Sequence, residues 1–214
     1  MTTKLLNLAA LKAAPAPRAP YPHITASGLL SPTSASALAQ DFPAIKKPGF
    51  FPLDLLEKKG AFATLIEDLQ GPELAEILSE KLGLDLRDKP RMITVRKWSA
   101  AQDGRIHNDG EAKISTSLIY LDPKKDNAAD GSGKFRVLKS DKSFDDMAME
   151  VNSEYGNFVA FARTENSWHG HKPFVGERRV IQITWLRSWD DYNRKHKRGH
   201  LSHFLKKFLT RSEY

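Results

Sequence analysis

The sequence predicts an α+β protein whose core is mainly β, a double-sheet jelly roll or barrel with helices before it and one helix after it. From residue 91 onward the chain contains short runs rich in β-branched and aromatic residues, separated by clusters of Gly, Asp, Asn and Ser. No helix-length segment alternates with these runs, which disfavours a parallel βαβ sheet and favours antiparallel sheets. With 214 residues, 40% of them hydrophobic, the chain can bury one sizeable core.

The first part of the chain predicts a flexible segment, a strand and a helix. Residues 1–20 are expected to be flexible and to end in an extended, proline-rich stretch. A strand follows and ends at Gly28. A helix over residues 31–42 is indicated by Ser31 as N-cap and Pro32 in the first turn.

Two further helices are expected before the β-rich part begins. Residues 53–69 carry apolar side chains at approximately helical spacing. Residues 71–83 repeat this pattern, with Pro72 at the helix start and Gly83 as a plausible C-cap.

One domain is expected over residues 21–189, and it consists of the β-rich part and the helices that precede it. Its expected strands are residues 91–98, 113–121, 134–138, 157–163 and 178–187. A basic amphipathic helix is expected over residues 190–214. Its apolar stripe, which would dock on the body of the protein or form a homodimer, consists of Leu201, Phe204, Leu205, Phe208 and Leu209.

Composition and charge exclude several classes of protein. The chain has no cysteine, which excludes disulfide scaffolds, iron–sulfur clusters and thiol nucleophiles and agrees with a cytoplasmic location. The net charge is +7, and residues 190–214 hold seven basic against three acidic residues. This tail is most simply a solvated helix face, and no aromatic-interleaved basic motif favours a nucleic-acid partner. No segment approaches the ~20 apolar residues that span a membrane.

Three scattered side chains suggest a metal site. His107 and Asp109 lie two residues apart just before an expected strand, so both could face one ion if this stretch is extended. His169 precedes the last long strand. Two imidazoles and one carboxylate form the ligand set of an iron(II) site with open coordination positions, although zinc hydrolases use the same ligand types. Arg179, ten residues after His169, could hold an organic acid beside the metal.

The combination resembles the iron(II)- and 2-oxoglutarate-dependent oxygenases of the prolyl 4-hydroxylase-like superfamily. The matching segments are YPHITASGLLSP, GRIHNDGEAKISTSLIYLDP, GSGKFRVL and NFVAFARTENSWHGHKPFVGERRVIQITW. The resemblance implies a double-stranded β-helix core with helices packed outside it. It also implies that His107, Asp109 and His169 bind iron and that Arg179 pairs with the distal carboxylate of 2-oxoglutarate, for which a guanidinium offers a planar fork. Tyr120 or Thr116 would donate a hydroxyl to this co-substrate.

Two of these assignments have competitors. His171 could replace His169 as ligand, but the family usually has a proline four residues after its histidine, and Pro173 stands four residues after His169. Arg178 competes with Arg179, and only one of the two can point inward because adjacent strand residues face opposite sides.

The resemblance implies a reaction in which 2-oxoglutarate and dioxygen yield succinate and carbon dioxide while an unactivated C–H bond is hydroxylated, with ascorbate as a candidate reductant. The substrate is expected to be a prolyl or other amino-acid side chain, or a small metabolite. Candidate substrate-facing residues are Arg96, Trp98, Arg136, Asn166, Trp168 and His171.

Two other functions compete with this hypothesis. One is a cupin-type metal enzyme that does not use 2-oxoglutarate. The other is a non-catalytic binding module that acts through its basic helix.

Overall fold

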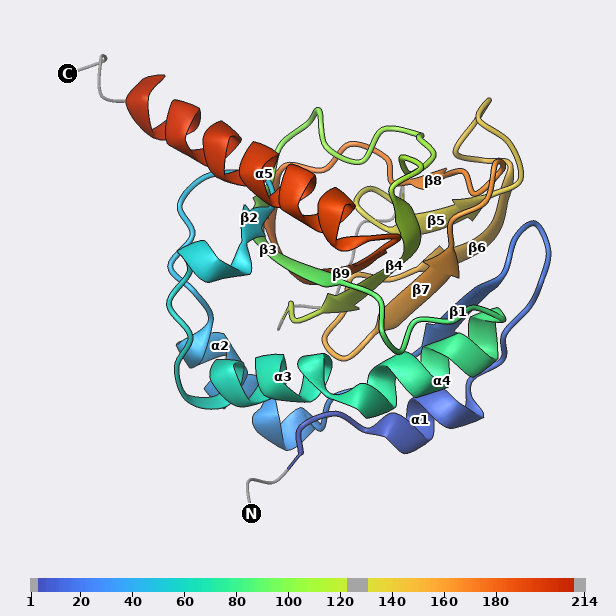
Figure 1. Cartoon of the computed structure of the whole chain (residues 1–214), viewed down its shortest axis with the longest axis horizontal. Coiled ribbons are helices and arrows are strands. Elements are labelled where there is room, and N and C mark those ends of the chain that lie inside the picture. Colours follow the sequence, from blue (N-terminus) through green and yellow to red (C-terminus); the bar gives the residue numbers. More distant parts are fainter. Residues whose placement is uncertain (1–3, 123–130, 210–214) are drawn as a thin grey trace.

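The computed structural model describes residues 4–122 and 131–201 in full and the backbone of residues 202–209. Its centre is a pair of facing antiparallel sheets (Figure 1). The large sheet has the strand order β1 (His23–Ala26), β7 (Phe158–Ala162), β4 (Lys113–Tyr120), β9 (Gly176–Leu186), β3 (Arg91–Ser99) and β2 (Phe51–Pro52). The small sheet has the order β6 (Met147–Val151), β5 (Phe135–Leu138) and β8 (His169–Gly170).

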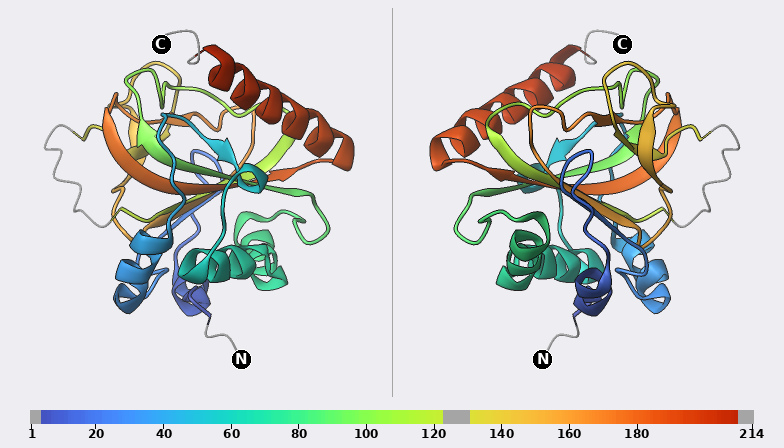
Figure 2. Two further views of the ribbon diagram at one scale, coloured as in Figure 1. Left: turned by 90° about the vertical axis from the view of Figure 1, so that its left-hand side faces the viewer. Right: turned by 90° about the vertical axis from the view of Figure 1, so that its right-hand side faces the viewer.

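Helices cover the large sheet on both sides. Figure 2 shows α1 to α4 as a layer below this sheet and α5 on the opposite side. Their bounds are α1 (Leu8–Ala13), α2 (Ala35–Asp41), α3 (Gly60–Gln70), α4 (Pro72–Leu82) and α5 (Trp189–Leu209), with short 3₁₀ turns at Pro32–Ser34 and Leu53–Leu55. The expected jelly-roll core with flanking helices and a C-terminal helix is therefore confirmed.

The two faces of the large sheet form two separate hydrophobic clusters. On β9, the odd-numbered Ile181, Ile183 and Trp185 are fully buried against the helix layer. The even-numbered Val180 faces the small sheet and belongs to a cluster with Phe135 and Phe161. Because side chains alternate along a strand, one face of the large sheet packs against the helices and the other faces the small sheet.

The five expected strands of the β-rich part occur close to their predicted bounds, whereas β6 and β8 were not expected. β8 has only two residues, and β6 is an edge strand with partly exposed side chains, so neither has a strong hydrophobic pattern. The helix expected over residues 53–69 begins only at Gly60, since the preceding residues form a 3₁₀ turn and an extended link.

The N-terminal segment differs from the expected flexible lead-in, because residues 4–20 pack against the body. Leu6 and Leu11 are buried in the main core, and the ammonium of Lys81 donates to the carbonyl oxygen of Ala14 at 2.8 Å. On α5, Leu201 is exposed; the side chains of Phe204, Leu205, Phe208 and Leu209, which complete the expected stripe, lie outside the described residues. Among the described helices, none has the length and apolar character required to cross a membrane.

The end of α4 provides a test of how the helix layer is closed. Gly83 terminates this helix with φ of 70° and donates its N–H to the carbonyl oxygen of Ser79. A side chain is unfavourable in this left-handed conformation, so Gly83→Ala should lower the free energy of unfolding by about 1 kcal/mol. Urea denaturation would measure the change. Gly110→Ala is the control, because Gly110 has no positive φ and its Cβ would meet no atom within 4 Å. Equal stability of the two variants would contradict the role given to Gly83.

Candidate metal centre

The structure brings His107, Asp109 and His169 together between the sheets. One ligand atom of each residue lies within 4.8 Å of the others. His107 and His169 pair through two backbone hydrogen bonds, each 3.0 Å long, which join the segment before β4 to the short strand β8. Apart from this bridge, residues 107–109 belong to no strand, and the side chains of His107 and Asp109 nevertheless converge, as the sequence predicted.

Hydrogen bonds set the orientation of both imidazoles. The Nδ1 atom of His107 lies 2.8 Å from the carbonyl oxygen of Arg105, and that of His169 lies 2.8 Å from the carbonyl oxygen of Ser167. A carbonyl only accepts, so each Nδ1 carries the proton and each Nε2 keeps its lone pair. Burial lowers the pKa of His169 to about 4, which keeps this imidazole neutral at physiological pH. Neutral imidazoles with a fixed tautomer are suited to metal ligation.

Asp109 is buried but ionised. Burial acts to raise its pKa, yet the nearby charges of Lys113 and His169, together with hydrogen bonds from Lys113 and Thr116, outweigh burial and lower the pKa to about 2. Lys113 contacts one carboxylate oxygen, and the hydroxyl of Thr116 donates to the other at 2.6 Å. Asp109 therefore presents a negative charge beside the two histidines.

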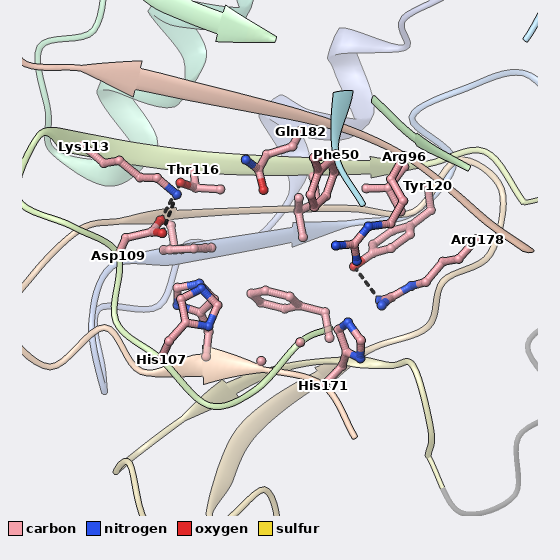
Figure 3. A pocket seen from close by; sticks show the side chains of 17 residues that line it. Phe50, Arg96, His107, Asp109, Lys113, Thr116, Tyr120, His171, Arg178 and Gln182 are labelled. Carbon is pink, nitrogen blue, oxygen red and sulfur yellow. Dashed lines mark hydrogen bonds and ion pairs between the residues drawn. The ribbon is translucent and has the colours of Figure 1, made fainter. Parts of the chain in front are cut away.

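A cavity of about 230 Å³ extends from this cluster. Figure 3 shows that the labelled side chains form two groups, with His107, Asp109, Lys113 and Thr116 at one end and cationic and aromatic side chains at the other. The residues that line the cavity are Phe50, Arg96, Gly104, His107, Asp109, Lys113, Thr116, Leu118, Tyr120, Phe135, Phe161, His169, Gly170, His171, Arg178, Val180 and Gln182.

Of the two neighbouring arginines on β9, Arg178 lines the second end of the cavity and Arg179 does not. Arg178 is buried, and its Nε donates to Ser153 at 3.1 Å and its Nη2 to the hydroxyl of Tyr120 at 3.4 Å. Only these two of its five N–H donors are used in these contacts. Tyr120, which the sequence placed in the co-substrate site, thus lies beside an arginine that lines the cavity.

The expectation that Arg179 faces the cavity is wrong. Its guanidinium lies on the helix side of the sheet, where it binds Glu177 at 2.7 Å and the carbonyl oxygen of Ala39 at 3.2 Å. It also lies over the ring of Phe42. The reason is strand parity, because β9 turns its even-numbered side chains toward the small sheet and its odd-numbered ones toward the helices.

Two of the six expected substrate-facing residues line the cavity. Arg96 lies over the ring of Phe50 and is held by Ser99 and Asp103. The Nδ1 atom of His171 donates to the carbonyl oxygen of Lys172, which leaves Nε2 as an acceptor. Among the described residues, neither this Nε2 nor the Nε of Arg96 has a hydrogen-bond partner, although both atoms are buried.

The other four expected residues do not line the cavity. Trp98 donates from its indole to the carbonyl oxygen of Ile45. Arg136 is occupied by Glu150 and Asp145 on the outer side of the small sheet. The side chain of Asn166 is exposed, and the backbone carbonyl of Trp168 accepts hydrogen bonds from Tyr21 and Leu138. None of these four residues therefore lines the cavity.

Two residues that line the cavity, Lys113 and Gln182, were not among the predicted site residues. Lys113 pairs with Asp109, and Gln182 lines the cavity opposite Leu118 in the register of β4 and β9. The alternation of Arg178, Val180 and Gln182 along β9 contained this information. To infer from this alternation which residues face the cavity, one would first have to know that the apolar Ile181, Ile183 and Trp185 face the helices.

Comparisons with known proteins agree with this arrangement. Residues 94–187 match the model of the 2OG-Fe(II) oxygenase superfamily. A prolyl-4-hydroxylase from Pseudomonas putida has a similar fold, with a TM-score of 0.53 and 15% identity over 78% of this chain and 88% of that protein. The viral collagen prolyl hydroxylase of Paramecium Bursaria Chlorella virus-1, in a truncated form, gives a TM-score of 0.51 and 15% identity over 78% and 89%. No curated protein matched the sequence.

The segment of residues 94–187, which contains all three clustered residues, is similar to the 2OG-Fe(II) oxygenase superfamily. The resemblance indicated by the sequence motifs is thereby confirmed. Members of this superfamily are oxygenases that use iron(II), 2-oxoglutarate and dioxygen. At 15% identity, the prolyl hydroxylase structures establish the shared fold and leave the substrate open.

The half-buried carboxylate of Asp122, which accepts from the backbone of Arg179, gives a test of the local electrostatics. The backbone N–H of Arg179 donates to Asp122, but burial raises the pKa of Asp122 to about 6, because the charged form is poorly solvated. Since this folded-state pKa lies above the ordinary value of 3.8, Asp122 destabilises the fold increasingly as pH rises from 3.8 to about 6, and fully above that pH. Asp122→Asn should therefore raise the free energy of unfolding at pH 7.5 by about 1 kcal/mol, allowing for solvent screening.

The gain should disappear near pH 4, where Asp122 is protonated in the folded protein. Thermal melting at both pH values would measure it, with the exposed Asp141→Asn as control. A destabilised Asp122→Asn variant at pH 7.5 would show that the charge of Asp122 supports the fold.

Proposed function

We propose that the protein is an iron(II)- and 2-oxoglutarate-dependent dioxygenase that hydroxylates an unactivated C–H bond, with release of succinate and carbon dioxide. One observation carries the proposal: the histidine and aspartate cluster and the guanidinium of Arg178 lie at opposite ends of one cavity. A dicarboxylate bound between them would have one end at the metal and the other at the arginine.

His107, Asp109 and His169 would hold the iron. Their donor set suits iron(II), because two neutral imidazoles and one carboxylate leave coordination positions open. The carbonyl oxygens of Arg105 and Ser167 fix the imidazole tautomers, and Thr116 orients Asp109. When bound, the metal supplies oxygen activation, which no protein side chain provides.

Arg178 and Tyr120 would bind the distal carboxylate of 2-oxoglutarate. A guanidinium forms a paired contact with a carboxylate, and the phenol of Tyr120 lies within 3.4 Å of Nη2 of Arg178. Thr116, the other expected donor, uses its hydroxyl hydrogen on Asp109. We therefore assign Thr116 to positioning the metal ligand, and Arg178 replaces Arg179 in the proposal.

The substrate would enter beside Arg96 and His171. The lone pair on Nε2 of His171 can accept a hydrogen bond from an N–H or O–H group, and Arg96 offers positive charge. An amino-acid side chain in a peptide, including the prolyl group named for the structural neighbours, and a small polar metabolite all fit these features. Ascorbate, as reductant, remains part of the proposal.

The arginine pair provides a matched test of co-substrate binding. Arg178→Ala should raise the KM for 2-oxoglutarate roughly a hundredfold, because two charge-assisted hydrogen bonds of about 1.5 kcal/mol each are lost. Arg179→Ala should leave KM within about twofold. Succinate formed from 2-oxoglutarate by iron-loaded protein in the presence of oxygen is the readout.

The opposite order of the two variants would restore Arg179 as the co-substrate residue. Unchanged turnover in both, together with no binding of 2-oxoglutarate, would favour the cupin-type enzyme. Retention of the fold in each variant would be checked by circular dichroism.

The histidines provide a test of the metal ligands. His107→Ala should remove one equivalent of bound iron(II) and abolish succinate formation without a large change in melting temperature, because the side chain of His107 is exposed. His171→Ala should keep this equivalent of iron, since its ring is not in the ligand cluster. Equilibrium dialysis with metal analysis would measure both. Loss of iron in His171→Ala and its retention in His107→Ala would refute the ligand assignment.

A further inference from the structure

A second group of metal-binding side chains lies outside the cavity. Asp54, in the 3₁₀ turn after β2, meets His196 and His200 of α5, and one ligand atom of each lies within 4.8 Å of the others. The Nε2 atoms of His196 and His200 are 2.9 Å and 2.7 Å from Oδ2 of Asp54. None of the three residues lines the cavity described above.

The geometry of α5 presents both imidazoles to the same point. Positions 196 and 200 are four residues apart and therefore project from one face of the helix. Their ring centres are 4.3 Å apart, and the ring of Tyr192, one turn earlier, stacks on His196 with an interplanar angle of 15°. The imidazole pair is thus aligned by the helix itself.

Gly199 allows the helix to approach the turn closely. A Cβ atom at this position would lie 3.2 Å from Cγ of Pro52, next to the turn that carries Asp54. A glycine inside a helix costs about 1 kcal/mol relative to alanine, so its presence needs a reason. The close approach of α5 to β2 supplies this reason and brings His196 and His200 within reach of Asp54.

The donor set is chemically suited to an ion. Partial burial acts to raise the pKa of Asp54, but hydrogen bonds and charge interactions with the two histidines outweigh it and lower the pKa, so the carboxylate is ionised. Donor atoms around a tetrahedral zinc ion are about 3.3 Å apart, from metal–ligand bonds of ~2.0–2.1 Å. The observed separations of 2.9 Å and 2.7 Å would have to open by only about half an ångström.

The cluster is also accessible. The side chains of His196, His200 and Asp54 are 33%, 35% and 47% exposed, so an ion can enter and a water molecule can take the fourth position. Two imidazoles that share one carboxylate oxygen form a compact three-ligand set with one open side. A hydrogen-bonded cluster and a metal site differ here only in whether a cation replaces the two Nε2 protons.

We propose that Asp54, His196 and His200 form a second metal site that takes a divalent transition-metal ion of the zinc type and clamps α5 to the Leu53–Leu55 turn. The site is independent of the iron centre, since the two share no residue. Two histidine ligands and one carboxylate favour zinc over magnesium or calcium, which prefer oxygen ligands.

The test counts zinc in protein whose first site has been removed. In a His107→Ala/Asp109→Ala background, titration followed by calorimetry should find one equivalent of Zn²⁺. Adding His200→Asn or Asp54→Asn should weaken this binding at least a hundredfold, while each replacement keeps a hydrogen-bonding side chain of similar size. Lys197→Gln, on an exposed part of the same helix, is the matched control and should bind normally.

A second measurement distinguishes loss of the site from loss of the fold. Zinc should raise the melting temperature of the background protein and of Lys197→Gln, because it binds only the folded form, and should not raise that of His200→Asn. The variants should show the same melting temperature without zinc to within a few degrees. No zinc binding by the background protein, or zinc binding that is unaffected by both His200→Asn and Asp54→Asn, would overturn the proposal.

Discussion

The two backbone hydrogen bonds between His107 and His169 are the contact on which the rest of the site depends. They join an irregular segment that precedes the large sheet to a two-residue strand of the small sheet, across 62 positions of sequence. The backbone then holds both histidines at one place, and the carbonyl oxygens two residues before each fix their tautomers. Asp109 lies in the same cluster because it follows His107 by only two residues. A metal centre of this kind is therefore a property of sheet pairing rather than of one local motif.

Strand β9 shows how one segment serves both packing and chemistry. Its odd-numbered apolar side chains are buried against the helix layer, and its even-numbered Arg178, Val180 and Gln182 line the cavity. A shift of one residue would exchange the two sets, placing polar groups against helices and apolar ones in the cavity. The burial of Ile181, Ile183 and Trp185 therefore fixes which arginine faces the cavity. Stability and function are set by the same register.

The C-terminal helix α5 lies between the outer surface of the protein and the residues around the cavity. It packs on the side of the large sheet away from the other helices, close to β2 and β3 (Figures 1 and 2). Lys195 on this helix is partly buried, and burial is the main cause of its lowered pKa. The charges of Lys113, which lowers this pKa further, and of Asp109, which raises it, also act on Lys195. An ion bound by Asp54, His196 and His200 would anchor the same helix directly after Lys195. The position of α5 relative to the cavity would then depend on metal as well as on packing.

The sequence by itself determined the jelly-roll class, the five main strands of the β-rich part and the identity of the metal-binding candidates, because alternation and turn residues are local signals. It also indicated Tyr120 as a site residue, and Tyr120 lines the cavity and contacts Arg178. Only the tertiary structure decided between Arg178 and Arg179, since the spacing from His169 runs through a loop whose length does not fix strand parity. The tertiary structure also decided which candidate substrate residues line the cavity: Arg96 and His171 do, and Trp98 and Arg136 do not. The Asp54 cluster joins residues 142 positions apart, and no local pattern encodes a contact that only packing of α5 on the sheet creates.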